Sequence, residues 1–281
     1  MNPNRRHFAA SIGAAAASIA FFPARARAAA DLRIAFIPEV ATTSASLSEK
    51  QPFIDYFAKA TGRRVDLKIP TNYAATVEAL GNGSVDLAYF GGLTYLKASA
   101  LYGAKPLVQR VEDRNFHSLF ITNSPAINSL KDLKGKQFAF GDVNSTSGHL
   151  IPVKELLEAG VDPEKDMTTR FTGNHTTTAL AVNSGQVPAG ALDETVYHKM
   201  IDDKTIDPAK TRVFYTSKPF LDYVWAVRKD LEEPLVAQIR SAFLNLGDPK
   251  VLAIVRGTKY VAANDQEYDA LRAVAKKLGL L

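Results

Sequence analysis

Short apolar runs alternate with longer amphipathic stretches over most of the chain. The first set predicts strands at 31–37, 64–70, 85–90, 106–111 and 117–122, with helices at 52–62, after Asn72 and at 94–103. The second set predicts strands at 136–142, 168–173, 187–193, 211–217 and 223–228, with helices at 152–160, 233–247 and 265–279. This alternation is typical of βαβ units, so we expect an α/β protein with a mainly parallel sheet wrapped by helices.

One segment is similar to another that follows it 102 residues later. NYAATVEALGNGSV from Asn72 aligns with NHTTTALAVNSGQV from Asn174, and both predict an Asn-capped helix, a glycine turn and a strand. Chance could produce such a match between short helices. A real repeat would mean two related α/β lobes that each present a helix N-terminus to a shared cleft, with Tyr73 and His175 as counterparts.

The N-terminus differs from the rest of the chain. Arg5 and Arg6 precede an Ala-rich apolar run of about 15 residues that ends in small-x-small triplets near 28–30. The run is shorter than the roughly 20 residues of a membrane span. We therefore expect a cleaved export signal at 1–30 that resembles the twin-arginine type, with an ordinary secretory leader or a basic tail as the alternatives.

Removal of this leader changes the charge of the protein. Residues 1–30 contain four arginines and no acidic residue, so the net charge falls from +5 to +1. A nearly neutral mature chain without basic runs indicates no partner nucleic acid and no anionic membrane surface.

Cofactor and enzyme motifs are missing from the sequence. The chain has no cysteine, which excludes disulfides, thiol nucleophiles and a lipid-anchored N-terminal Cys, and its five histidines lack metal-ligand spacing. It contains neither a phosphate-cradling G-x-x-x-x-G-K loop nor an H-E-x-x-H pair. Ser145, His175 and Asp222 could be selected as a triad, but no G-x-S-x-G elbow supports that choice. We expect no catalytic residue, no metal and no cofactor.

The stretch GDVNSTSGHLIP places Ser145, Thr146 and Ser147 between a strand-like run and an amphipathic helix. A helix start exposes unpaired N–H groups and the positive end of the helix dipole, and the hydroxyls add further donors. An oxyanion could bind there without a formal positive charge, although simple capping explains such residues equally well. Pro152 either kinks this helix or marks the start of its regular part.

Several motifs together resemble a known family. FGDVNSTSGHLIP, GNHTTTALAV, NYAAT, VDLAYFG and FLDYVWAV are similar to the phosphate/phosphite/phosphonate-binding family of periplasmic solute-binding proteins that serve ABC importers. The resemblance implies a periplasmic-binding-protein type II clamp, in which two α/β lobes are joined by two hinge crossovers. Crossovers are expected near 117–122 and 212–217, so that 31–119 with 215–281 form lobe 1 and 120–214 form lobe 2.

The same resemblance implies a ligand site. The residues at the family's ligand-binding positions are the hydroxyl run Ser145, Thr146 and Ser147, together with Tyr73, His175, Asp222 and Tyr223. By this resemblance the histidine reaches the ligand oxygens, while the first tyrosine and the aspartate face it from the opposite lobe.

One position departs from the family pattern. Some phosphonate binders have a second tyrosine before the glycine of the VD-x-A strand, where this chain has Phe90. Tyr95 is expected to supply a ring or hydroxyl instead, with Thr94 as its neighbour.

The implied function is that of the periplasmic substrate-binding component of an ABC importer. The resemblance implies a monomer that captures a small phosphorus oxyanion (phosphonate, phosphite or phosphate) in the interlobe cleft and meets a permease in the inner membrane. An ionised Asp222 would repel a fully deprotonated anion and accept a hydrogen bond from a protonated one, so we expect it to select against sulfate. A sensor module for a membrane histidine kinase and a phosphoester or phosphonate hydrolase are the alternatives.

Overall fold

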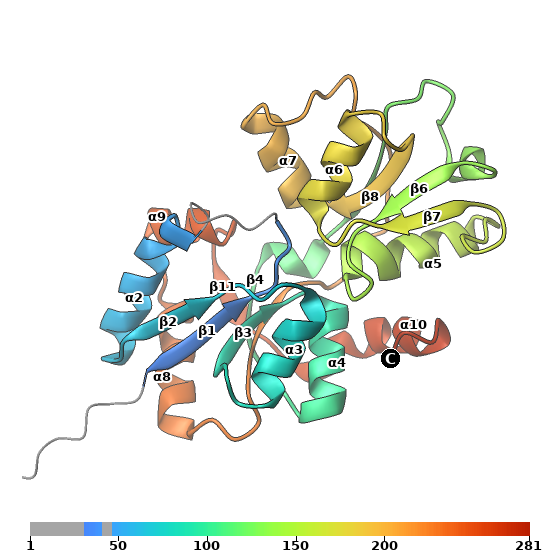
Figure 1. Cartoon of the computed structure of the whole chain (residues 1–281). Helices are drawn as coiled ribbons and strands as arrows, with labels where there is room; N and C mark the ends of the chain where they lie inside the picture. The colour runs from blue at the N-terminus through green and yellow to red at the C-terminus, as the bar shows by residue number, and fades with distance from the viewer. Residues whose placement is uncertain (1–30, 41–46) are drawn as a thin grey trace, which may run out of the picture.

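Two β-sheets, one in each lobe, organise the chain (Figure 1). The structure, a computed structural model, describes residues 31–40 and 47–281. The predicted export signal at 1–30, with its twin-arginine motif, lies outside the described residues. No helix within the two described ranges is both long and apolar enough to cross a membrane.

The first sheet has six strands in the order β11, β4, β10, β3, β1, β2. They are β1 (Leu32–Phe36), β2 (Val65–Lys68), β3 (Leu87–Phe90), β4 (Lys105–Arg110), β10 (Val224–Val227) and β11 (Tyr260–Ala262). The helical segments of this lobe are α2 (Gln51–Thr61), α3 (Tyr73–Gly81), α4 (Gly92–Tyr102), η1 (Glu112–Asn115), α8 (Glu233–Leu244), α9 (Pro249–Ile254), η4 (Asp265–Tyr268) and α10 (Asp269–Lys277). Helices α2 and α8 pack together, as do α3 and α4, and the sheet runs between the two pairs (Figure 1).

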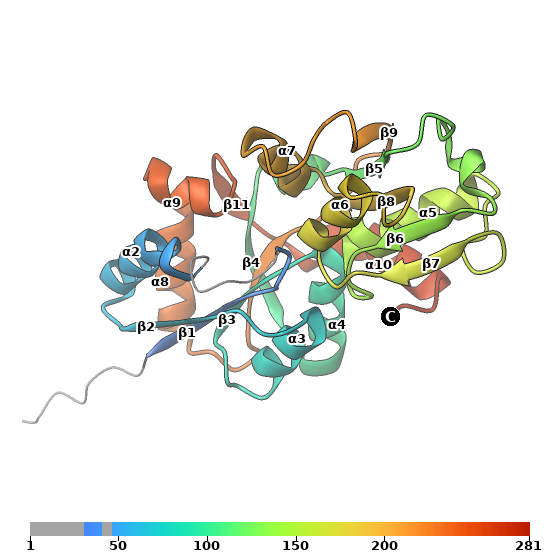
Figure 2. The same ribbon diagram turned by 45° about the horizontal axis from the view of Figure 1, so that its top comes forward.

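The second sheet has five strands in the order β7, β6, β8, β5, β9, and Figure 2 shows β6, β8 and β7 side by side. They are β5 (Ser118–Thr122), β6 (Gln137–Phe140), β7 (Thr168–Phe171), β8 (Ala189–Asp193) and β9 (Arg212–Thr216). The helical segments of this lobe are η2 (Leu130–Leu133), η3 (Thr146–Leu150), α5 (Ile151–Glu158), α6 (His175–Asn183) and α7 (Glu194–Asp202). Alternate side chains of β5 enter separate cores, because Leu119 and Ile121 pack with α6 and α7 whereas Phe120 packs on the face that α5 covers.

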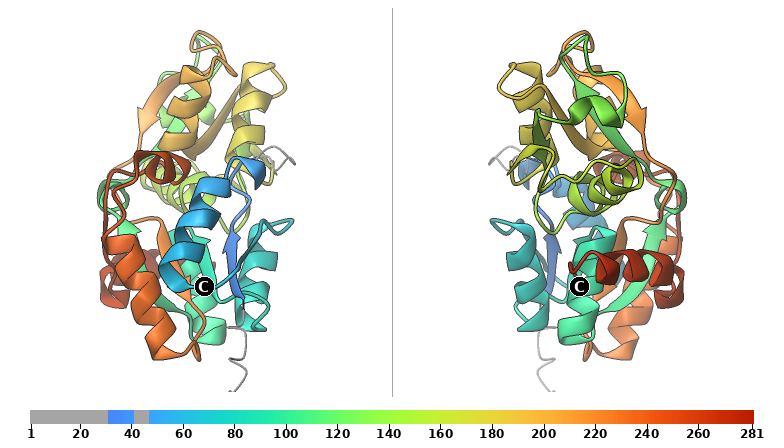
Figure 3. Two further views of the ribbon diagram at one scale, coloured as in Figure 1. Left: turned by 90° about the vertical axis from the view of Figure 1, so that its left-hand side faces the viewer. Right: turned by 90° about the vertical axis from the view of Figure 1, so that its right-hand side faces the viewer.

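Two chain crossings join the lobes, which Figure 3 shows one above the other. The chain leaves the first sheet after β4 and returns to it at β10, and the crossings pair at Phe116 and Phe220 through two backbone hydrogen bonds of 3.0 Å. The crossing strands β5 and β9 also pair with each other. The predicted lobe boundaries at 119/120 and 214/215 stay a prediction, since the strands show only which sheet a segment joins.

Both sheets are mixed, so the expectation of a mainly parallel sheet was wrong. Within each sheet the strands of the βαβ units are parallel, namely β2, β1 and β3 in one and β7, β6 and β8 in the other. The first strand after each crossing, β10 or β5, runs antiparallel to them, because the chain enters each sheet there from the other lobe.

The internal similarity is confirmed at the level of structure. Helices α3 and α6 each have nine residues and begin after an asparagine, Asn72 or Asn174, whose side chain accepts a hydrogen bond from the third helical N–H. Each is followed by a glycine in the left-handed region, Gly83 at φ 75° and Gly185 at φ 78°, and then by a strand. The two lobes therefore present equivalent helix N-termini toward each other.

Gly190, in the centre of β8, leaves no room for a side chain. A Cβ there would lie 2.9 Å from the Ala139 carbonyl oxygen and 2.9 Å from Thr178 Cγ2. We expect Gly190→Ala to lower the free energy of unfolding by about 1–3 kcal/mol, because strand β6 or helix α6 must shift to admit the added methyl group. Denaturant unfolding measures this, with Gly247→Ala as the control, since a Cβ at Gly247 meets nothing within 4 Å. Equal effects of the two substitutions would contradict the prediction.

Candidate functional site

The N-terminus of α4 lies where the two lobes meet. Its N-cap, Gly91, has no side chain, so the first helical donors find partners elsewhere. The Gly92 N–H donates to Asp222 Oδ1 at 2.8 Å, and the Leu93 N–H donates to Thr146 Oγ1 at 3.0 Å from the second lobe. A Cβ at Gly91 would lie 3.1 Å from that hydroxyl and 3.3 Å from the carboxyl oxygen. The missing side chain at Gly91 thus permits this close approach.

The three consecutive hydroxyls have three different environments. Ser145 is the N-cap, and its Oγ accepts a hydrogen bond from the Gly148 N–H at 3.0 Å. Thr146 binds α4, while Ser147 Oγ is buried without a hydrogen-bond partner among the described residues. The turn that they begin is a π-helical turn, a feature that is frequent at functional sites. Capping therefore accounts for the first hydroxyl and not for the third.

Pro152 lies in the first turn of α5, which continues directly from the π-helical turn. The second prediction, that Pro152 marks the start of the regular helix, is confirmed, because α5 begins at Ile151. A residue without an N–H is tolerated in the first turn of a helix.

Asp222 is fully buried at the start of β10. Its Oδ1 accepts the Gly92 N–H, whereas Oδ2 has no hydrogen-bond partner within the described part of the chain. Burial raises the pKa of this carboxyl well above its usual range, and the Gly92 N–H and the Thr146 hydroxyl offset only part of that effect. The carboxyl can therefore hold a proton where an exposed aspartate would be ionised.

His175, the first residue of α6, meets two tyrosines. Its Nδ1 lies 3.3 Å from the backbone N–H of Asp193 and accepts from it, which leaves the proton of a neutral ring on Nε2. Nε2 lies 3.4 Å from the hydroxyl oxygens of both Tyr73 and Tyr223, longer than the usual hydrogen bond of about 2.9 Å. Burial lowers the pKa of His175, which favours the neutral ring.

Asp193 stands behind this histidine. The Tyr223 hydroxyl donates to Asp193 Oδ2 at 2.7 Å, and Oδ1 accepts from the Val196 N–H at 2.9 Å at the start of α7. Burial alone would raise the pKa of Asp193, but the Arg256 guanidinium and the hydrogen bonds from the Val196 N–H and the Tyr223 hydroxyl bring it below the ordinary value. A buried carboxylate thus orients one tyrosine of the cluster.

Most of the predicted ligand residues come together at this point. The buried cluster contains Tyr73, Thr94, Ser145, Thr146, Ser147, His175, Asp222 and Tyr223. Thr94 donates its hydroxyl to the Asn144 carbonyl oxygen at 2.9 Å, so it holds the turn before the hydroxyl run. Tyr95 lies elsewhere, because its hydroxyl donates to Asp265 and its ring packs against Tyr268. The ligand-binding roles themselves stay predictions.

Sequence reasoning missed several buried residues of this region. Asp193 could have been found, since a carboxylate at the end of a strand and the start of a helix is a typical N-cap. The ring of Tyr89 stacks on that of Tyr223 with 5.0 Å between the ring centroids, and its buried hydroxyl has no partner among the described residues, whereas the family pattern marks the neighbouring position of Phe90. Arg256 approaches from the C-terminal part of the chain, and no local pattern marks it.

No group of three or more His, Cys, Asp or Glu residues in 31–40 and 47–281 is arranged as a metal site. The cluster instead offers hydroxyl, imidazole and backbone donors beside a carboxyl with a raised pKa. Such a set can hold an oxyanion through hydrogen bonds and share a proton with it.

Comparison with known proteins agrees with this chemistry. A family model described as "ABC transporter, phosphonate, periplasmic substrate-binding protein" matches residues 35–268. The probable ABC transporter phosphite binding protein PhnD1 of Prochlorococcus marinus is 28% identical over 268 residues, which cover 86% of this chain and 90% of that protein. The phosphate-import protein PhnD of Mycolicibacterium smegmatis is 30% identical over 257 residues, which cover 81% of this chain and 80% of that protein.

Solved structures show the same fold. PhnD1 from Prochlorococcus marinus in complex with methylphosphonate has a TM-score of 0.82 at 28% identity, and the match covers 89% of this chain and 98% of that chain. A binding protein component of an ABC phosphonate transporter from Pseudomonas aeruginosa has a TM-score of 0.80 at 24% identity, covering 88% of this chain and 86% of that chain. The predicted type II clamp of two α/β lobes is therefore confirmed.

The two serines of the hydroxyl run should respond oppositely to truncation. Ser145→Ala removes a helix cap, so we expect the free energy of unfolding of the ligand-free protein to fall by about 0.5–2 kcal/mol. Ser147→Ala removes a buried hydroxyl without a partner, so we expect the unfolding free energy to stay equal or to rise slightly. Denaturant unfolding of both variants measures the contrast. A larger loss for Ser147→Ala than for Ser145→Ala would show that the hydroxyl has a structural partner.

Proposed function

The chain belongs to the family of periplasmic substrate-binding proteins of phosphonate ABC transporters, and from this premise we propose that it captures a small phosphorus oxyanion between its lobes. Its relatives are named for phosphite binding and phosphate import, and one was solved with methylphosphonate. The proposed ligand is thus phosphonate, phosphite or phosphate. A permease is the partner that membership in such a family implies, and a monomeric state stays a prediction.

One observation carries the proposal, the pair of unpartnered buried atoms Ser147 Oγ and Asp222 Oδ2 in the described chain. Leaving a buried polar atom unpaired costs about 1–3 kcal/mol. An oxyanion that accepts from Ser147 and shares a proton with Asp222 would satisfy both atoms. The hydroxyl of Tyr73 and the Nε2–H of His175 are further neutral donors beside them.

Proton sharing with Asp222 supports a phosphorus acid over sulfate. A closed site that holds a dianion against an ionised carboxylate would place like charges together away from water. A phosphate group has its second pKa near 6, so the ligand can bring the shared proton itself. Sulfate brings no proton, so its binding depends on Asp222 keeping its own proton.

The packing around His175 supports a small ligand. The Tyr223 hydroxyl is already occupied by Asp193, and Tyr73 closes on the same imidazole from the opposite lobe. The polar atoms left for a ligand are therefore few. A headgroup with a compact substituent fits this arrangement better than one with a long polar tail.

Hydrolysis has little support in this geometry. His175 Nε2 lies next to the two tyrosine hydroxyls, and Ser145 Oγ accepts the Gly148 N–H. Asp222 is hydrogen-bonded to Gly92 and so does not orient the histidine. We propose capture and release without turnover, which incubation with phosphate and phosphonate esters followed by product analysis tests. A sensing role would instead require a kinase partner.

The selectivity of the site should depend on Asp222. We expect the protein to bind phosphite, phosphate or methylphosphonate more tightly than sulfate, and Asp222→Asn to weaken the phosphorus acids and narrow the gap to sulfate. Affinity of the unaltered protein should fall as pH rises, because the pKa of Asp222 is raised and the shared proton is lost at high pH. Calorimetric titration with this panel at several pH values measures both effects. Unchanged selectivity and an unchanged pH profile in the Asn variant would refute the proton-sharing role.

Ser147→Ala should weaken binding without harming the fold. Loss of one hydrogen bond to a charged ligand costs about 1.5–3 kcal/mol, which corresponds to roughly 10- to 150-fold in Kd. The same titration measures it, with Ser241→Ala as the matched control on the exposed side of α8. An affinity equal to that of the control would place the anion away from the hydroxyl run.

A further inference from the structure

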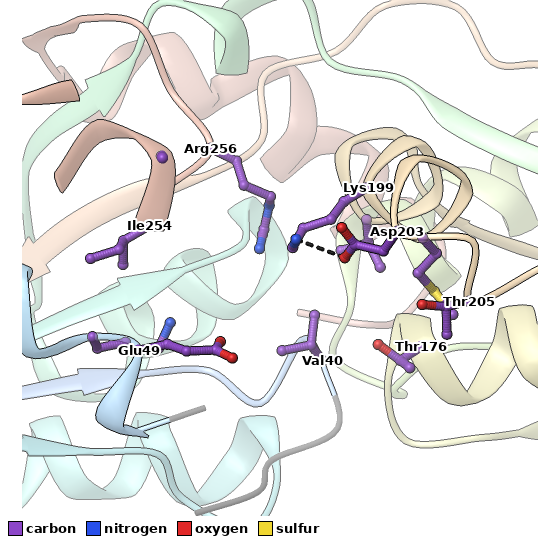
Figure 4. A pocket seen from close by; sticks show the side chains of 12 residues that line it. Val40, Glu49, Thr176, Lys199, Asp203, Thr205, Ile254 and Arg256 are labelled. Atoms are coloured by element: carbon purple, nitrogen blue, oxygen red, sulfur yellow. Dashed lines mark hydrogen bonds and ion pairs between the residues drawn. The ribbon is translucent and has the colours of Figure 1, made fainter. Parts of the chain in front are cut away.

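Arg256 lies in the space between the lobes, next to the predicted site. It lines a pocket of about 450 Å³ together with residues of α7 and the end of α9 (Figure 4). In Figure 4 its side chain leaves the α9 side and points toward Lys199 on α7. No motif singled out in the sequence includes this arginine.

The backbone of Arg256 is held in a conformation that arginine rarely adopts. It follows α9 with φ at 49°, in the left-handed region where glycine is the usual residue after a helix. The adjacent Gly257 N–H returns to the Leu252 carbonyl at 3.2 Å and closes the helix end. Such a conformation persists where surrounding contacts hold the residue in place, and the side chain of Arg256 makes contacts of this kind.

The side chain connects the two lobes. The Arg256 guanidinium pairs with Glu39 of the first lobe, and its Nε donates to Thr195 Oγ1 of the second lobe at 3.1 Å. The Thr195 hydroxyl in turn donates to Asp193 Oδ1 at 2.7 Å. The carbonyl oxygen of Glu39 accepts the N–H of His175 at 3.0 Å. This series of contacts therefore ends at Asp193 on one side and at His175 on the other, and both belong to the buried cluster at the predicted ligand site.

The first lobe holds the arginine rigidly. Arg110 donates through Nη1 to the Val255 carbonyl at 2.8 Å and to the Arg256 carbonyl at 3.2 Å. A Cβ at Gly257 would lie 2.8 Å from Arg110 Cδ, so this turn fits tightly over the buried guanidinium. The Arg256 side chain is thus anchored on one lobe, and its contact with Thr195 needs the other lobe in place.

We propose that Arg256 is a latch for the closed state, a positioning residue that acts through Thr195 and Asp193 on the ligand-binding cluster. This inference rests on the proposed function. Opening at the hinge separates Arg256 from Thr195, so ligand release requires the latch to break. The guanidinium also places a positive charge near Asp193, which keeps that carboxylate ionised and bonded to Tyr223 while the lobes are closed.

The test measures opening and ligand release directly. The chain has no cysteine, so Lys59→Cys in the first lobe and Lys210→Cys in the second, both exposed, give a fluorescent pair that reports closure. Phosphite, phosphate and methylphosphonate serve as probes. Failure of the unaltered protein to bind any of them overturns the proposed function. If the unaltered protein binds one of these probes, the role of Arg256 can be tested independently of the proposed function.

The main variant combines Arg256→Gly with Glu39→Gln, so that Glu39 is not left as a buried carboxylate without its ion-pair partner. Glycine relaxes the left-handed turn, and the unfolding midpoint of the ligand-free protein should therefore stay equal or rise. The dissociation rate of the probe should increase by at least about tenfold, since loss of a buried charged contact acts mainly on release. Lys204→Gly is the control, because Lys204 also has a positive φ, 56°, but is exposed.

Thr195→Val cuts the latch on the other lobe and leaves the Arg256 pair with Glu39 intact. We expect faster release here too, with Thr195→Ser close to the unaltered protein because it keeps the hydroxyl. An unchanged dissociation rate in both the Arg256→Gly, Glu39→Gln variant and Thr195→Val would overturn the proposal. A fall in unfolding midpoint with unchanged release would do the same, since it is the result expected of a purely structural arginine.

Discussion

A buried ion pair between Arg110 and Asp113, both with side chains 0% exposed, underlies the arrangement of the site. Through its carbonyl oxygen Asp113 accepts the Asp222 N–H, and the Arg110 guanidinium lies 5.2 Å from the ring of Tyr223. The same guanidinium holds the carbonyl of Arg256. Burying such a pair gains little net stability, because desolvation opposes the attraction. What it supplies here is position, since it places Asp222, Tyr223 and Arg256 relative to one another.

The site built on this support is closed by the approach of three helix N-termini. Helices α3 and α6 face each other through Tyr73 and His175, and α4 reaches Asp222 and the hydroxyl run with its uncapped donors. Each terminus contributes partial positive charge to the predicted ligand site without a lysine or arginine in the predicted set. In the hydroxyl run, Ser147 Oγ is the buried atom that these groups leave without a hydrogen-bond partner within the described chain.

Local patterns predicted the parts of this site that depend on neighbouring residues in sequence. Capping by Asn72 and Asn174, the helix start at the hydroxyl run and the strand before it follow from short-range rules, and all are present. Tyr95 was misplaced because successive helical residues point about 100° apart, and only packing decides which one faces the cleft. The mixed sheets and the approach of Arg256 depend on contacts across the whole chain, which no local pattern encodes.

Arg256 lies one layer behind the predicted ligand position, and this has a consequence for the proposed selectivity. A guanidinium in direct contact with the anion would favour sulfate and phosphate alike, since both offer paired oxygen acceptors. Placed against Glu39 and Thr195, the charge of Arg256 instead favours the closed state regardless of which anion is inside. Discrimination is then left to Asp222, which by the proposed function shares one proton with the ligand and so favours an anion that can bring that proton itself. Under the two proposals, the group that favours closure is separate from the group that selects the ligand, so the protein would hold its ligand firmly and still reject an anion of the same shape.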